Sequence, residues 1–186
     1  MSWVEDENTF RVAYQRALDC AATDSGRLPT SLQKMTYDDV DVLSDAFAGL
    51  IQKLLEWSAD DECAFVVLRP DPVYYFHHFF GKYPVIEIKR GMNASDYLAV
   101  LNEAPPDSRA DALGTIYAEY VFAPPSLRWF IHALRSAESD GGHLWVPSEW
   151  VDRVAAVYPY ATVGRWPGHE VTKNPLCPIH PRLHRG

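Results

Sequence analysis

The sequence predicts an α+β fold in which a small antiparallel sheet of about three strands is covered by several helices. Apolar residues recur at three- and four-residue spacing in several segments, which is typical of amphipathic helices. Between residues 63 and 89 the chain is instead rich in β-branched and aromatic residues, which favours strands. A chain of 186 residues, 47% of them hydrophobic, suits a single domain; we place it at residues 1–163, before an irregular tail at 164–186 that contains prolines and histidines.

Two helices are expected in the first third of the chain. The first spans about residues 8–22, where Phe10, Ala13 and Ala17 share one face, and turn residues follow from Asp24 onward. The second spans residues 40–55, with Thr36 as its N-cap. Its apolar stripe consists of Val40, Leu43, Phe47, Leu50, Ile51, Leu54 and Leu55.

The expected sheet is a meander of three strands over residues 63–68, 73–80 and 85–89. The middle segment has an alternative interpretation. Asp71 and Pro72 are also suited to the N-cap and first position of a short helix that ends before Gly81. We prefer the strand, because Val73 to Phe76 have high β-propensity.

Further helices are expected near residues 97–101, 110–121 and 127–134, and from Ser148 onward. The segment 110–121 is ambiguous, since Ile116, Ala118, Tyr120 and Phe122 also alternate as in a strand. Gly141 and Gly142 precede residues 143–146, which suit a short strand.

The net charge of −8 is concentrated in the first third of the chain. Residues 1–62 hold 13 of the 25 acidic residues but only 5 of the 17 lysines and arginines, so this segment carries −8 and the remainder is neutral. Such a field opposes binding to nucleic acid or to anionic lipid and would steer a basic protein partner toward this segment. No apolar run is long enough for a membrane span, and the acidic start is unlike a signal peptide. We therefore expect a cytoplasmic protein in which Cys20, Cys63 and Cys177 are free thiols.

No catalytic sequence motif is present, and no cofactor or metal is expected. The strongest metal candidate is the tail, where Cys177, His180 and His184 follow His169. The prolines around these residues keep the chain extended, and no paired cysteine motif accompanies them, so we expect no zinc site. His77 and His78 lie among aromatic residues, and His132 and His143 stand alone in apolar segments. Such histidines usually pack rather than react.

We expect a non-enzymatic protein that binds a basic protein partner, as immunity proteins and antitoxins of bacterial toxin systems do. The chain shares their small size, acidity, aromatic content and lack of catalytic motifs. The expected contact residues are an acidic cluster, which the dipole of the second helix also favours, and aromatic anchors. They are Asp38, Asp39, Asp41, Asp45, Trp57, Tyr74, Tyr75 and Tyr83.

The alternative is a small enzyme that pairs a histidine with a carboxylate. Its histidine would be His77, His78, His132 or His143. Glu87 and Glu119 are candidate carboxylates, because their neighbours in the sequence are apolar.

Overall fold

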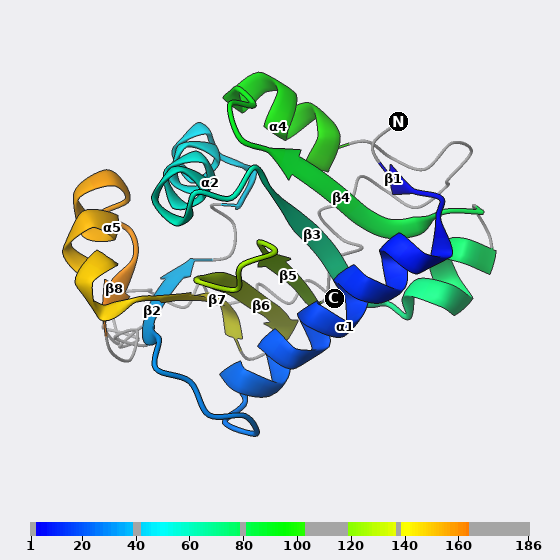
Figure 1. Ribbon diagram of the computed structural model, residues 1–186, viewed down its shortest axis with the longest axis horizontal. Helices are drawn as coiled ribbons and strands as arrows, with labels where there is room; N and C mark the ends of the chain where they lie inside the picture. The colour runs from blue at the N-terminus through cyan, green and yellow to red at the C-terminus, as the bar shows by residue number, and fades with distance from the viewer. Residues whose placement is uncertain (1–2, 39–41, 79–80, 103–118, 137–138, 164–186) are drawn as a thin grey trace, which may run out of the picture.

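The computed structural model describes residues 3–38, 42–78, 81–102, 119–136 and 139–163 (Figure 1). Within these ranges the α-helices are α1 (Glu7–Asp24), α2 (Asp45–Ser58), α4 (Ala94–Leu101) and α5 (Val151–Val157), and the short helical segments are η2 (Pro72–His77) and η4 (Ser148–Trp150). The strands are β1 (Trp3–Val4), β2 (Gln33–Asp38), β3 (Glu62–Arg69), β4 (Tyr83–Lys89), β5 (Glu119–Ala123), β6 (Phe130–Ser136), β7 (Ser139–Val146) and β8 (Thr162–Val163). No helix in these ranges is long and apolar enough to cross a membrane.

The strands form one antiparallel sheet of eight strands in the order β1-β4-β3-β5-β6-β7-β2-β8. The expectation of a small sheet of about three strands is therefore wrong, although strands and helices do coexist as expected. The two-residue strands β1 and β8 lie at the two edges. Most of the central strands are buried on both faces, and such strands lack the alternation that identifies a strand in sequence.

Helices cover both faces of the sheet (Figure 1). On one face α1 packs against β3, β4, β5 and β6. On the other face the stripe of α2 forms the larger core, together with α4 and α5. Alternate residues of β3 divide between the two cores, since Val66 lies in the α1 core and Phe65 and Val67 lie in the α2 core.

Both helices expected in the first third are confirmed, with one change of boundary. The first runs over Glu7–Asp24, with Asp6 as its N-cap. The second begins at Asp45, capped by Ser44, and not at residue 40. Thr36, the expected cap, lies in β2, which was not expected as a strand.

The expected strand at residues 73–80 is wrong over its described part, because η2 is helical there. The Asp71 side chain accepts hydrogen bonds from Val73 N (3.0 Å) and Tyr74 N (2.7 Å), and Pro72 occupies the first position. This N-cap outweighs the β-propensity of the residues that follow. The alternative interpretation of this segment is therefore confirmed.

The expected helix at 127–134 is also wrong, since β6 occupies most of that segment. Phe130 and Ile131 face opposite cores, so apolar side chains on both faces imitate helical spacing. Of the ambiguous segment 110–121, residues 119–121 belong to β5, and residues 110–118 lie outside the described ranges.

Most other expectations agree with the structure. Residues 63–68, 85–89 and 143–146 lie in strands, and residues 97–101 and 148–157 are helical. Cys20 and Cys63 are buried free thiols. Cys177 and the tail at 164–186 lie outside the described ranges.

Candidate acid-base site

The candidate site is built around Asp24, the last residue of α1. A carboxylate at the C-terminal end of a helix is disfavoured by the helix dipole. The Asp24 side chain is only 8% exposed, so other groups must compensate for its charge. His132 Nδ1 and His143 Nδ1 lie 2.8 and 2.7 Å from Oδ2. The Trp145 indole donates to Oδ1 over 2.8 Å, and Lys34 Nζ lies 3.2 Å from the same oxygen.

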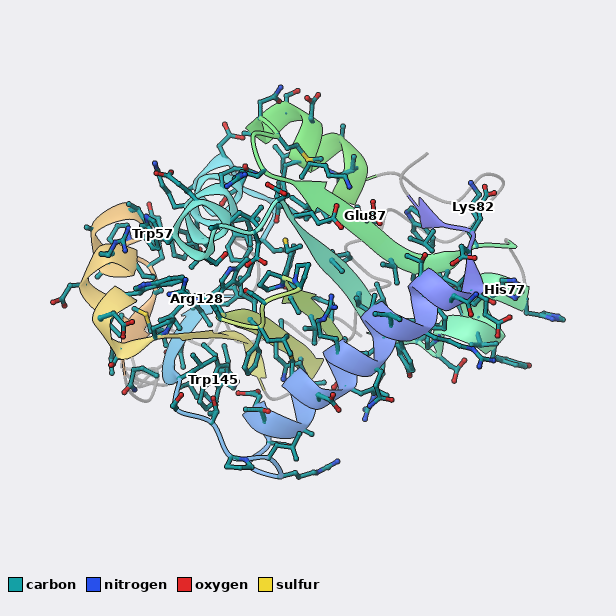
Figure 2. The ribbon with its side chains drawn as sticks, viewed as in Figure 1. Trp57, His77, Lys82, Glu87, Arg128 and Trp145 are labelled. Carbon is teal, nitrogen blue, oxygen red and sulfur yellow. The ribbon has the colours of Figure 1, made fainter. Side chains whose placement is uncertain are left out.

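The sheet register brings these partners together. His132 on β6 lies directly opposite His143 on β7, and Trp145 lies opposite Lys34 on β2. Residues two apart in a strand share a face, so all four side chains lie on the face that α1 covers. Trp145 lies beside the C-terminal end of α1 (Figure 2).

A second carboxylate extends the network on the far side of His132. His132 Nε2 lies 3.1 Å from Glu119 Oε1, and Arg69 Nε lies 2.8 Å from Glu119 Oε2. The His132 ring therefore has a carboxylate at each nitrogen, and both its nitrogens act as donors only in the imidazolium form.

The pKa values follow from this geometry. Burial alone would lower the pKa of His132, but hydrogen bonds to Asp24 and Glu119 outweigh it and raise the pKa to about 9. Burial alone would raise the pKa of Asp24, but hydrogen bonds from His132 and His143 hold it well below its usual range. The hydrogen bond from His132 also lowers the pKa of Glu119. At neutral pH the centre is thus an imidazolium between two carboxylates.

His143 differs from His132 in having one nitrogen at the surface. Its side chain is 32% exposed, and within the described ranges its Nε2 makes no hydrogen bond. An ionised Asp24 can only accept, so Nδ1 carries the proton of the neutral ring and Nε2 carries the lone pair. A histidine oriented by a buried carboxylate in this way can act as a general base through Nε2.

The structure describes six of the eight residues expected to contact a partner. Asp38 ends β2 and Asp45 is exposed in the first turn of α2, whereas Asp39 and Asp41 lie outside the described ranges. Trp57 is partly buried, with the guanidinium of Arg153 4.2 Å from its ring centre.

The expected tyrosine anchors differ in exposure. Tyr74 is 73% exposed, whereas Tyr75 is partly buried. Tyr83 is 5% exposed and lies in the α1 core, where its ring stacks on Phe10 and His77. His77 and Trp57 lie at opposite sides of the molecule in Figure 2. The expected aromatic anchors therefore do not form one continuous surface.

The remaining candidates divide in a similar way. His77 stacks on Tyr83 and His78 stacks on Tyr74. Glu87 pairs with Lys89 over 3.1 Å. His132, His143 and Glu119 do come together, whereas the Cys177 cluster lies outside the described ranges. In the part of the chain that the structure describes, no three His, Cys, Asp or Glu side chains are grouped to hold a metal.

Sequence reasoning missed Asp24, Lys34 and Trp145 as members of the site. Asp24 was interpreted only as a residue that ends the first helix. A signal was present in its position, because an acidic residue at a helix C-terminus needs compensation.

No family model matches the sequence, and no curated protein or solved structure matches it. The functional argument therefore depends on the site itself.

Proposed function

We propose that the protein is an enzyme in which His143 Nε2 acts as a general base on water or on a substrate hydroxyl. One observation carries this proposal: buried Asp24 binds the Nδ1 atoms of two histidines, which leaves Nε2 of the partly exposed His143 as the accessible basic atom. A purely structural cluster would not need a nitrogen lone pair at the surface.

The neighbouring groups support hydrolysis of an ester. In the proposed step, Nε2 takes a proton from water while the water oxygen attacks the carbonyl carbon or the phosphorus. The imidazolium then returns the proton to the departing alcohol oxygen. Lys34 pairs with Asp24 over 3.2 Å, and its ammonium group, 5.6 Å from the Trp145 ring centre, also brings positive charge to the site that would favour an anionic substrate.

Hydrolysis of a panel of p-nitrophenyl carboxylates, phosphate monoesters and phosphate diesters tests this proposal. Removing a general base typically costs about 10²- to 10⁴-fold in rate, so we expect a loss of that size for His143→Gln. The matched control is His78→Gln, which removes an exposed histidine outside the site. A wild-type rate no higher than that of buffer across the panel, or equal rates for wild type and His143→Gln, would contradict the proposal.

A second measurement does not depend on finding the substrate. Nitrogen chemical shifts of the histidine rings report the tautomer, and we expect neutral His143 to carry its proton on Nδ1. Asp24→Asn should remove that preference, because an amide no longer requires a donor. A neutral His143 that carries its proton on Nε2 would contradict the proposal, because Nε2 would then have no lone pair with which to accept a proton.

A second candidate function is the binding of a basic protein partner, in the manner of an inhibitor. It is favoured by Val73 and Tyr74, which are adjacent in η2 and are both exposed. Exposed aromatic residues are common anchors of interfaces. If the acidic residues steer that partner, replacing Asp38, Asp39, Asp41 and Asp45 with lysine should slow association and reduce its salt dependence. Replacement with asparagine is the milder control, and an unchanged association rate would argue against steering.

A further inference from the structure

A threonine hydroxyl lies beside His143, on the neighbouring strand β2. Thr36 is directly opposite His143 in the register of β2 and β7. Residues paired in this way share one face of the sheet, and their Cβ atoms lie about 4.5 to 5.5 Å apart. Thr36 is only partly buried, as is His143. The base and the hydroxyl are therefore both within reach of a small substrate.

The contacts of the His143 ring show on which side its Nε2 lies. Asp24 Oδ2 is 2.7 Å from His143 Nδ1 and 2.8 Å from His132 Nδ1, so this oxygen lies between the rings carried by β7 and β6. The two nitrogens of an imidazole ring are distinct and point in different directions. Because Nδ1 is bound on the side of β6, Nε2 is turned away from β6. The neighbour of β7 on that other side is β2, the strand that carries Thr36.

The contacts between the Thr36 hydroxyl and the edge strand β8 are long. Thr36 Oγ1 lies 3.4 Å from Thr162 Oγ1 and 3.5 Å from Thr162 O. Hydrogen bonds between oxygen atoms are usually about 2.7 to 2.8 Å long, so neither contact holds the hydroxyl firmly. A rotation about the Cα–Cβ bond of Thr36 exchanges these contacts for a hydrogen bond to His143 Nε2. Catalytic hydrogen bonds commonly tighten in this way only when substrate is bound.

Asp24, His143 and Thr36 thus form a series of carboxylate, base and hydroxyl. A buried carboxylate that orients a histidine, with a hydroxyl on the other side of the ring, is the arrangement that activates hydroxyl nucleophiles on unrelated folds. Here the end of α1 supplies the carboxylate, and the paired strands β7 and β2 supply the base and the hydroxyl. The sheet register fixes the second pair, and the hydrogen bond from Nδ1 fixes the first.

We propose that Thr36 is the nucleophile of this site and that the ester is cleaved in two steps. This inference rests on the proposed function, because it needs His143 as the base. In the first step Nε2 takes the Thr36 proton, Oγ1 bonds to the carbonyl carbon or the phosphorus, and the alcohol leaves with that proton. In the second step Nε2 takes a proton from water, and the water oxygen attacks the ester formed on Thr36. The bond to Oγ1 breaks, and the proton returns to Oγ1, so the water attack described above is the second of the two steps.

Acid quenching of the full chain during turnover of the p-nitrophenyl panel, followed by peptide mass spectrometry, tests this proposal. We expect the acyl or phosphoryl group of the substrate on Thr36 in wild type and no such group in His143→Gln. Thr36→Val removes the hydroxyl at nearly constant shape and should lower the rate of hydrolysis by about 10²-fold or more, whereas Thr36→Ser should keep most of the rate. Thr162→Val is the matched control, because it removes a hydroxyl that lies one strand further from His143.

The outcomes distinguish a failure of this proposal from a failure of the proposed function. If Thr36→Val is as active as wild type, or if the substrate group is found on a residue other than Thr36, His143 acts directly on water and Thr36 has no catalytic role. Methanol gives a test that needs no accumulated intermediate. Esters of one acid with different leaving alcohols should then yield the same ratio of methyl ester to free acid, and a ratio that changes with the leaving alcohol would overturn the two-step scheme. A wild-type rate equal to that of buffer would overturn both proposals.

Discussion

Asp24 is the residue on which most of the polar chemistry of this protein depends. Its charge lies at the end of α1 that the helix dipole disfavours, and it is stabilised by groups from three strands. Because these groups come from β2, β6 and β7, one carboxylate ties the first helix to the second half of the chain. The acid-base site and the stability of the fold are therefore coupled.

The first prediction concerns pH and His132. Its pKa is raised to about 9 from 6.5, so its contribution to the free energy of unfolding is complete below about pH 6.5 and is lost as the pH rises through 9. The pKa of Asp24 is depressed, so its contribution to the free energy of unfolding is present above pH 3.8 and is lost as the pH falls below that value. We expect His132 to contribute at most about 3 kcal/mol, most of it lost between pH 6.5 and 9.

Urea unfolding at a series of pH values measures this contribution. The fall in the free energy of unfolding above pH 6.5 should be much smaller in His132→Gln than in wild type. It should be unchanged in His78→Gln, since His78 is exposed and lies outside the network. An equal fall in wild type and His132→Gln would show that His132 is not the group that titrates.

The second prediction compares two adjacent glycines in β7. A Cβ on Gly142 would lie 2.1 Å from Cζ of the buried Tyr37 ring, whereas a Cβ on Gly141 would have only Tyr37 O nearby, at 3.9 Å. The Tyr37 ring is 1% exposed and packs against Phe47 and Tyr158, so Gly142→Ala should lower the free energy of unfolding by about 2 kcal/mol or more. Gly141→Ala should change it by less than about 1 kcal/mol. Equal effects in denaturant titrations would show that the ring can move aside.

Some of the site could be predicted from the sequence and some could not. His132, His143 and Glu119 were found because ionisable residues in apolar segments are unusual. Asp24 was not, since its partners His132 and His143 lie 108 and 119 residues further along the chain. No local pattern contains a contact of that range.

At the scale of helices and strands, an element could be predicted from the sequence when one of its faces is exposed, because polar residues then alternate with apolar ones. Both α1 and α2 have an exposed face, so their apolar stripes were visible in the sequence. β6 is buried by cores on both sides, and its apolar residues therefore showed no period of two. In η2 the single side chain of Asp71 decided the conformation against the propensity of the residues after it.

The third prediction tests the buried stripe of α2. Leu50 is 1% exposed, and Leu50→Ala should lower the free energy of unfolding by about 2 to 5 kcal/mol, because it leaves a cavity in the larger core. The matched control is Leu18→Ala in α1, where the side chain is 38% exposed and should cost less than about 1 kcal/mol. A denaturant titration in which both variants lose the same stability would contradict the assigned burial of Leu50.

At the scale of the whole molecule, one sheet separates two cores that share the same strands. Each central strand contributes side chains to both cores, as Val66 and Phe65 do in β3. If one core is lost, the strands that the other core also needs lose their packing on one face. We therefore expect the described structure to unfold as one unit, although the sheet separates its two cores.

The fourth prediction follows from these shared strands. We expect one cooperative unfolding transition, with far-ultraviolet circular dichroism and tryptophan fluorescence changing together. Phe10→Ala in the α1 core and Leu50→Ala in the α2 core should each shift both signals by the same amount. A variant that shifts one signal and leaves the other in place would reveal two independently folding halves.

The position of β2 in the sheet has a consequence during synthesis on the ribosome. β2 pairs with β7, and its first residue, Gln33, lies opposite Val146. Synthesis adds roughly 5 to 20 residues per second, so several seconds to some tens of seconds pass between the synthesis of β2 and that of its main partner, β7. Throughout that interval the apolar side chains of α2 lack much of the core that later covers them. We expect the nascent chain to be captured by chaperones until β7 emerges, and folding to be slow even when the finished protein is stable.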